Sequence, residues 1–352
     1  MRPPALVSAC LAAGAMSTIA MGGHELPVYP SYYPHEISIE TVAPENAAGL
    51  LRDGKIQAYV GAGLRLSEPP PAALRAVESL GGFVVAEVKP GSQLAPDAGC
   101  GAILAAARAA ADGGGFVFHP YPVTPFHGDY LYHLDRADAA KARVPAARRT
   151  DGPDGDLRIE VIDAAGLIDA SATAINGWLG PAWLRTGWFH AARLLADAID
   201  DPEARQRAEA LARRLETGDF RDTVDRINLE RDLVGLLSGG CRKLVVGYTV
   251  RRHYFSAEFT EGIENVGFDA LAGLDSPIFL RTVKLKNFPW NGWLALGVAG
   301  RPEAAWNPIA GFADGFGRLL WSAIGDPALI PDPYGAGWMP NRIANVEPNA
   351  AR

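Results

Sequence analysis

The feature that most restricts the fold is a strand, a helix and a second strand joined by very short connections. Residues 37–42 (ISIETV) alternate between apolar and polar side chains, as a half-buried strand does. Pro44 suits the first turn of the helix that follows, and Gly54 suits the left-handed backbone conformation that often ends a helix. Residues 55–60 (KIQAYV) form the second strand. A helix with short connections brings the chain back to the same end of the sheet. We therefore expect the two strands of this β-α-β unit to be parallel.

Helix and strand patterns continue to alternate along the chain. The expected elements are, in order, a helix at 71–80, a strand at 83–88, a helix at 102–111, a strand at 115–119, a strand at 157–162, a helix from about Ser171, helices at 204–215 and 222–238, and a strand ending at Val246. Residues 136–156, rich in Ala, Arg, Asp, Gly and Pro, predict a crossover between two units. The 352 residues, 48% of them hydrophobic, are enough for a large core.

Two stretches suggest the same kind of unit in both halves. Residues 50–61 (LLRDGKIQAYVG) and 236–247 (LLSGGCRKLVVG) match at both leucines, at the glycine after the helix, at the last valine and at the final glycine. In open parallel sheets, ligands bind outside the carboxyl ends of strands, where glycine lets the backbone approach them. Tyr59, Gly61 and Tyr248 are therefore expected to line a ligand site.

The N-terminus predicts export. Residues 1–20 contain one arginine followed by an uncharged, Ala-rich run, which is typical of a secretory signal peptide, although a buried Ala-rich helix is an alternative. We therefore expect a periplasmic or secreted protein with no membrane span after the leader is removed. Cys100 and Cys241 would then remain, either as a disulfide or as two separate thiols.

The order of these features resembles the type II periplasmic substrate-binding proteins of ABC importers. The resemblance rests on the leader, LLRDGKIQAYVG, the crossover and VVGYT, and DASAT at residues 169–173 is similar to the helix start of the phosphate- and phosphonate-binding branch. It implies an α/β fold with two lobes, each a mostly parallel sheet flanked by helices, and a ligand cleft between them. The lobes would be residues 24–135 and 157–250, and residues 251–352 would return to lobe 1 and end in a Trp-rich extension.

Charge and motifs exclude several functions. A net charge of −7 and the lack of a basic cluster argue against nucleic acid as a partner. No P-loop, GxGxxG, HExxH or GxSxG motif occurs, so we expect binding rather than catalysis and no organic cofactor. His253 with Glu258 or Glu261 could form an acid-base pair, but a solvated segment explains these residues equally well.

Residues 118–133 (FHPYPVTPFHGDYLYH) contain three of the seven histidines. His119, His127 and His133 could bind a divalent metal, because imidazole suits zinc, copper, manganese and iron. Alternatively, the prolines keep the segment extended and the histidines make ordinary hydrogen bonds. A third interpretation is a binding wall for an organic ligand, in which His119, His127 and Tyr130 face the cleft.

Two further groups could contact a ligand. Ser171 and Thr173 stand at an expected helix start, where they would either hold an anion or cap the helix. Trp290 and Asn291 lie in an expected tight turn, after a strand at 278–285, with an exposed ring that suits stacking. The leading hypothesis is an exported protein that binds a small polar or anionic ligand and delivers it to an ABC permease. The alternatives are a secreted metal-dependent enzyme and a periplasmic protein that docks on a partner through its C-terminal tryptophans.

Overall fold

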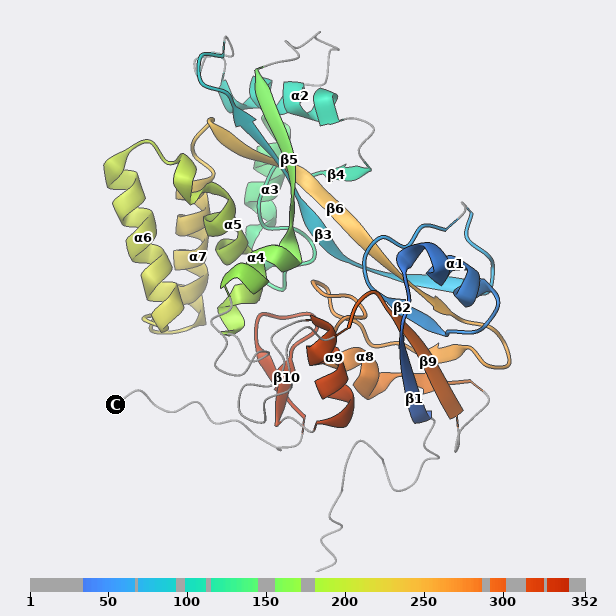
Figure 1. Ribbon diagram of the computed structural model, residues 1–352. Coiled ribbons are helices and arrows are strands. Elements are labelled where there is room, and N and C mark those ends of the chain that lie inside the picture. Colours follow the sequence, from blue (N-terminus) through green and yellow to red (C-terminus); the bar gives the residue numbers. More distant parts are fainter. Residues whose placement is uncertain are drawn as a thin grey trace, which may run out of the picture.

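A computed structural model gives the structure of the protein (Figure 1). It describes residues 34–66, 69–92, 99–111, 115–144, 156–171, 181–286, 292–301, 315–325 and 328–341. The expected signal peptide lies outside these residues, as do Thr173, Trp290 and Asn291. Within the described part of the chain, no helix is both long and apolar enough to cross a membrane.

A mixed sheet crosses the whole molecule and is built around two long strands (Figure 1). These strands, β3 (Leu74–Val88) and β6 (Lys243–Ser256), pair antiparallel from Leu74–Ser256 to Glu87–Lys243. The sheet order is β1-β9-β2-β6-β3-β5, and β4 pairs with β6 beside this path. The other strands are β1 (Pro34–Thr41), β2 (Ala58–Val60), β4 (Phe116–Phe118), β5 (Leu157–Asp163) and β9 (Gly292–Val298).

The predicted N-terminal β-α-β unit is confirmed, with one strand inserted into it. Both β1 and β2 run parallel to β9, which lies between them. Helix α1 (Pro44–Arg52) connects β1 to β2, with Pro44 in its first turn. Gly54 follows the helix with a left-handed φ of 66°. The chain therefore returns from the C-terminal region to complete the first unit.

The expectation of mostly parallel sheets is wrong for the rest of the molecule. All pairs that involve β3 or β6 are antiparallel, including those with β2, β4 and β5. The helix expected at 71–80 is also wrong, because residues 74–80 form the first half of β3. Their Ala, Arg and Glu residues suit a helix locally, but pairing along β6 decides the structure. Helix α3 (Leu134–Ala142) occupies the first part of the expected crossover, whose residues 145–155 are not described.

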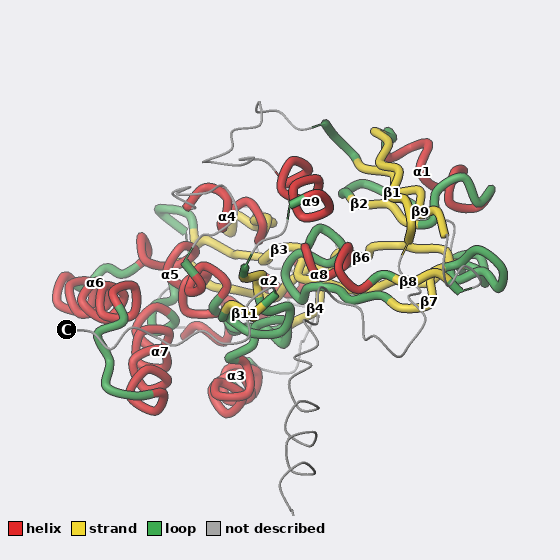
Figure 2. Tube along the Cα trace, turned by 90° about the horizontal axis from the view of Figure 1, so that it is seen from below, coloured by secondary structure: helices red, strands yellow, loops and turns green. Residues whose placement is uncertain are grey.

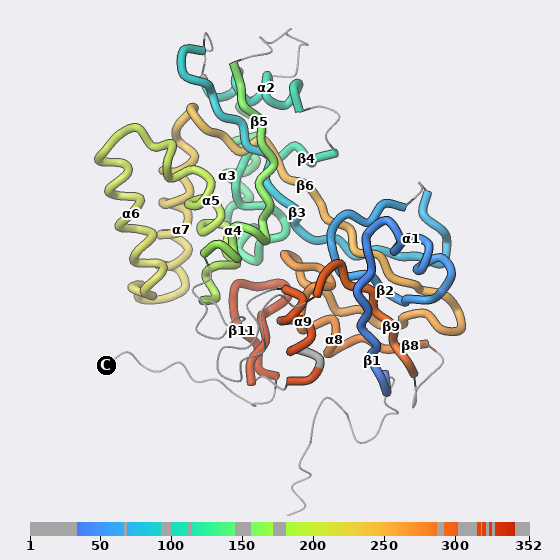
Figure 3. Tube along the Cα trace, in the orientation of Figure 1, coloured from blue at the N-terminus to red at the C-terminus, as the bar shows by residue number. Residues whose placement is uncertain are grey.

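Helices and small sheets gather at the two ends of the β3–β6 ladder (Figure 3). At one end lie α2 (Gly99–Ala111), α3, α4 (Ala164–Ser171), α5 (Gly187–Leu195), α6 (Pro202–Thr217) and α7 (Thr223–Leu237). At the other end lie α1, α8 (Pro277–Thr282) and α9 (Gly315–Ile324), with the strand pairs β7 (Ile263–Asn265) and β8 (Lys284–Leu285), and β10 (Leu329–Pro331) and β11 (Trp338–Pro340). In the view from below, α5, α6 and α7 again lie together, far from α1 (Figure 2).

Helices α6 and α7 occur where the sequence predicts them, at 204–215 and 222–238, with α6 slightly longer at both ends. Asp201 and Asp222 accept backbone N–H bonds at the starts of α6 and α7, and Gly218 closes α6 with a φ of 71°. Of the strand expected at 278–285, only Lys284–Leu285 is a strand, because Pro277 begins α8 and residues up to Thr282 are helical. Proline fits the first helical turn, where its missing N–H costs no hydrogen bond.

Each end of the ladder has its own hydrophobic core. Trp188 and Leu233 belong to the core at the α5–α7 end, to which β6 contributes Val245. Phe279 belongs to a core at the other end, to which β6 contributes Phe255. The two long strands connect these two cores, and Arg185, which precedes α5, adds a contact across them by donating to the carbonyl oxygen of Asp332, next to β10, over 3.2 Å.

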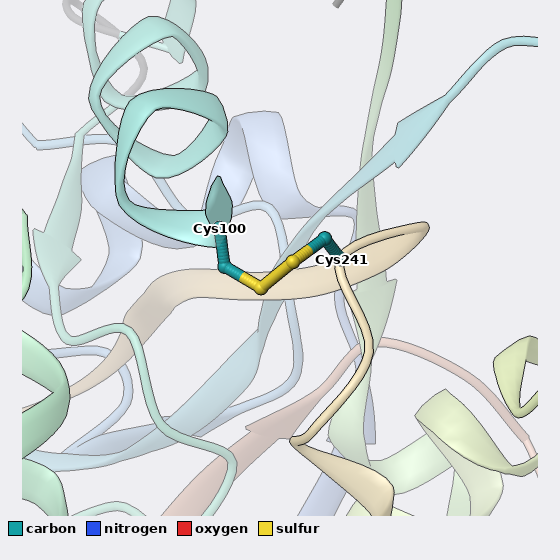
Figure 4. Close-up of a disulfide and its surroundings, with 2 residues drawn as sticks. All are labelled: Cys100 and Cys241. Atoms are coloured by element: carbon teal, nitrogen blue, oxygen red, sulfur yellow. A yellow bond between two sulfur atoms is a disulfide. The ribbon is translucent and has the colours of Figure 1, made fainter. Parts of the chain in front are cut away.

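Cys100 and Cys241 form a disulfide (Figure 4). Their Cα atoms are 4.9 Å apart, within the usual range for such a bond. The bond ties the start of α2 to the chain just before β6 and spans 141 residues of sequence. Of the two alternatives that the sequence left open, the structure shows the disulfide. Disulfides persist in oxidising compartments, which fits an exported protein.

Candidate functional site

A groove lies beside the middle of the β3–β6 ladder, between its two ends, and we call it the central groove. It has a volume of about 450 Å³. Its wall combines the loop after β2, the bend of β3, the end of β5 and the middle of β6. The lining residues are Gly61, Ala62, Gly63, Leu64, Gly81, Val161, Asp163, Thr249, Val250, Arg251, Arg252 and Tyr254.

Irregular pairing of β3 with β6 shapes the groove. The register shifts between Leu80 and Gly82, so that Gly81 forms a bulge. Bulges bend a strand and increase its twist, which turns one end of the ladder relative to the other. A Cβ atom at Gly82 would lie 2.5 Å from the carbonyl oxygen of Ile162 on β5, so a glycine is needed for close pairing there.

The prediction that Gly61 lies beside a ligand site stays open, but its position fits. Gly61 follows the carboxyl end of β2 and lines the central groove. It has a φ of 157°, and a Cβ atom there would lie 2.5 Å from the Cβ atom of Ala299. Gly61, Ala62 and Gly63 all line the groove, and none of them has a side chain larger than a methyl group.

Two arginines give the groove its charge. Arg251 donates to Asp163 over 2.6 Å, and Arg252 donates to Glu78 over 3.0 Å. Both pairs are partly exposed to water. An exposed ion pair of this kind contributes only about 0–1 kcal/mol. An anionic ligand could therefore replace Asp163 on Arg251 at small cost.

The predicted residues His119, Tyr130 and Tyr248 come together, but outside the central groove. The ring centroids of His119 lie 5.8 Å from those of Tyr130 and 5.7 Å from those of Tyr248. His119 is buried, and its Nε2 lies 2.9 Å from the carbonyl oxygen of Val123. Burial lowers the pKa of His119. These rings form part of the packed interior at the α5–α7 end of the ladder.

His127 pairs with His190, a residue that the sequence analysis did not select. The backbone N–H of Thr124 donates to His127 Nδ1 over 2.9 Å, which places the His127 proton on Nε2. That nitrogen then donates to His190 Nδ1 over 2.9 Å. Burial lowers the pKa of His127 to about 3 and also lowers that of His190. Both rings are thus neutral hydrogen-bonding groups.

The three histidines predicted as a metal site are not brought together. Among the described residues, the group that could hold a metal ion is Asp129, His133 and Glu230, so only His133 belongs to both sets. All three side chains are buried. Burial raises the pKa of Glu230 to about 7 and lowers that of His133 to about 4, and it also raises the pKa of Asp129.

Other predicted residues have structural roles. Tyr59 is buried, and its hydroxyl donates to the carbonyl oxygen of Val42 over 3.3 Å. Ser171 ends α4 instead of starting a helix, and its hydroxyl donates to the carbonyl oxygen of Leu167 over 2.9 Å, so it does not present a helix start to an anion. His253 Nε2 lies 3.0 Å from the hydroxyl of Ser79, and among the described residues no hydrogen bond or ion pair joins His253 to Glu258 or Glu261.

The sequence analysis missed Asp163 and Glu230. Asp163 ends the predicted strand β5 and meets Arg251 only through the antiparallel β3–β5 and β3–β6 pairings. Glu230 is an acidic residue in an amphipathic helix, a pattern that normally indicates solvent exposure. The one available signal was the pair Arg251-Arg252, which lies beyond the predicted end of the strand at Val246, whereas β6 continues to Ser256.

Comparison with known proteins gives little further information. No protein-family model matches the sequence, and no curated protein matches it. One similar solved structure is the ABC transporter-associated periplasmic binding protein DppA from Helicobacter pylori, in complex with the peptide STSA. The two chains are 14% identical, the match covers 70% of this chain and 56% of that one, and the TM-score is 0.35. This TM-score is too low to assign a shared fold, so the proposals below rest on the geometry of the chain itself.

Proposed function

We propose that the chain is an exported binding protein that holds a small polar or anionic solute in the central groove. The observation that carries this proposal is that Arg251 lines the same groove as residues 61–63, between the two ends of the ladder. The Cys100–Cys241 disulfide supports export to the periplasm or beyond. An ABC permease is the partner we infer for such a protein.

The charges of the groove suggest which ligands fit. A carboxylate or phosphate can accept a bidentate pair of bonds from the guanidinium of Arg251. Asp163, released from Arg251, can then accept a bond from an N–H group of the same ligand. A solute with an anionic group beside an N–H donor therefore uses both members of the pair, whereas a purely anionic one uses only Arg251.

The two lobes that we propose differ in their boundaries from those expected from sequence. Residues 99–142 lie with β5 and α4–α7, because Cys100 is bonded to Cys241 and β4 pairs with the first half of β6. The second lobe would thus contain the described residues between 82 and 249, and the first lobe the other described residues. Closure would bend the ladder at the Gly81 bulge and narrow the groove around the ligand.

Thermal-shift screening of the full chain against amino acids, short peptides, phosphate and small organic acids tests the proposal. A ligand at a hundredfold its dissociation constant should raise the free energy of unfolding by about 2.7 kcal/mol. Arg251→Gln should weaken that ligand by at least tenfold in calorimetric titration. Arg207→Gln, at an exposed position of α6 outside the groove, is the matched control and should bind like the wild type. A screen in which no compound raises the melting temperature would contradict the proposal. So would equal ligand affinities of Arg251→Gln and Arg207→Gln.

A further inference from the structure

Three buried side chains from two helical segments converge at the α5–α7 end of the ladder. Asp129 directly precedes the short 3-10 helix Tyr130–His133, His133 is its last residue, and Glu230 comes from the middle of α7. One potential ligand atom from each lies within 4.8 Å of those from the other two. Their exposed fractions are only 4% for Asp129, 0% for His133 and 1% for Glu230. Two carboxylates and an imidazole are thus enclosed together, away from water.

Two atoms of this group lack partners. His133 Nδ1 lies 2.9 Å from the hydroxyl of Tyr121, whereas His133 Nε2 is buried without a hydrogen bond. Glu230 Oε1 accepts from Arg226 over 2.5 Å, whereas Glu230 Oε2 is buried without one. Buried polar atoms are normally satisfied, and leaving one unpaired costs free energy. An imidazole nitrogen and a carboxylate oxygen without partners, at the same place, therefore indicate a missing ligand.

The third member is also weakly held. Both carboxylate oxygens of Asp129 accept long hydrogen bonds from the backbone N–H of Gly187, over 3.4 and 3.3 Å. These distances are longer than usual for an N–H donor, so the oxygens keep most of their capacity to bind a cation. Arg226 supplies only one positive charge beside the two carboxylates, so the ionised site keeps a net negative charge that attracts a cation.

We propose that Asp129, His133 and Glu230 form a binding site for one divalent transition-metal ion. The mixed nitrogen and oxygen set suits Zn²⁺ or Mn²⁺, whereas Ca²⁺ prefers oxygen ligands alone. In this arrangement His133 binds through Nε2, and its Nδ1–H donates to the Tyr121 hydroxyl. Tyr121 is then a positioning residue that fixes the orientation of the imidazole, as outer partners of metal-bound histidines do.

The ion would join α7 to the segment that begins α3. Glu230 lies on α7, and His133 directly precedes α3. The ligands are buried, so we expect the metal to enter during folding. The site lies outside the central groove, none of whose lining residues belongs to it. The inference is therefore independent of the proposed solute binding.

Refolding with and without metal tests the inference. The disulfide-bonded chain is unfolded in urea with EDTA, dialysed, and refolded with Zn²⁺, Mn²⁺, Ca²⁺ or no metal. After removal of free ions, elemental analysis should find one Zn²⁺ or Mn²⁺ per chain and no Ca²⁺, and the melting temperature should rise only with the bound ion. Absence of stoichiometric Zn²⁺ and Mn²⁺ in refolded and in freshly purified protein would overturn the proposal.

Variants identify the ligands. Glu230→Gln and His133→Gln should each abolish stoichiometric binding, and Tyr121→Phe should weaken Zn²⁺ by about 10–100-fold while the protein stays folded. His119→Gln removes a histidine of the sequence-predicted set and should leave binding unchanged. If His133→Gln fails to fold, Glu230→Gln and Tyr121→Phe still decide. Wild-type affinity for the metal in both Glu230→Gln and Tyr121→Phe, or loss of the metal in His119→Gln, would contradict the proposed ligand set.

Discussion

At the scale of single residues, the described part of the protein is marked by buried histidines. His119, His127, His133, His190 and His253 are all nearly inaccessible to water. Burial disfavours the charged imidazolium, so the pKa of each is lowered. The sequence gives the number of histidines but not their burial, because burial depends on contacts between residues far apart in the chain. His253, for example, contacts Ser79, 174 positions away.

This burial predicts that acid destabilises the protein and that His253 contributes. Desolvation, with a smaller effect of the positive charge of Arg251, lowers the pKa of His253 to about 4, whereas the unfolded chain keeps the ordinary value of about 6.5. Between these pH values the unfolded state binds more protons, so stability falls as the pH falls. The neighbouring Ser79 hydroxyl is neutral and cannot offset the charge.

Urea unfolding of wild type and His253→Gln between pH 7 and pH 4 measures this contribution. The variant should be less stable than the wild type at pH 7. As the pH falls, its free energy of unfolding should decrease less steeply, and the two slopes should differ by about 1.4 kcal/mol per pH unit. His35→Gln, at an exposed position of β1, is the control and should keep the wild-type slope. Equal slopes for wild type and His253→Gln would show that this histidine titrates alike in both states.

At the scale of elements, local patterns predict α1, α2, α6, α7, β4 and β5 well. Each has its own signal, such as Pro44 at the start of α1 or Gly218 after α6. The first half of β3 is missed because its local pattern suits a helix, and only pairing with β6, more than 150 residues later, makes it a strand. The same distant pairing brings Asp163 to Arg251, so the charged part of the groove could not be predicted.

Close packing beside the bulge of β3 predicts that Gly82 tolerates a substitution by alanine much less well than a glycine in open space. In Gly82→Ala, the new Cβ atom would lie 2.5 Å from a backbone oxygen of β5, which cannot move away like a flexible side chain. Overpacking of this kind typically costs about 1–3 kcal/mol. Gly337→Ala is the control, since a Cβ atom there meets no atom within 4 Å. Urea unfolding should show the loss only in Gly82→Ala, and equal stabilities would mean that β5 does not pack closely there.

At the scale of the whole molecule, the disulfide connects elements that are distant in sequence. It ties α2 to the start of β6 and closes a loop of 141 residues, so it restricts the unfolded chain strongly. The sequence left its pairing open, because two cysteines alone do not reveal their distance. In the structure, α2 packs across β5 and β6, with Ile103 and Val246 in one core.

Reduction should therefore weaken the protein substantially without unfolding it completely. Loss of a bond that closes so long a loop typically costs about 2–5 kcal/mol. Urea unfolding with and without a reductant measures this difference in the wild type. The double variant Cys100→Ser, Cys241→Ser should match the reduced wild type and should not respond to reductant. The core that contains Phe279 includes neither cysteine, so amide exchange there should change less than exchange in α2. Uniform loss of protection would instead show that the two ends of the ladder unfold as one unit.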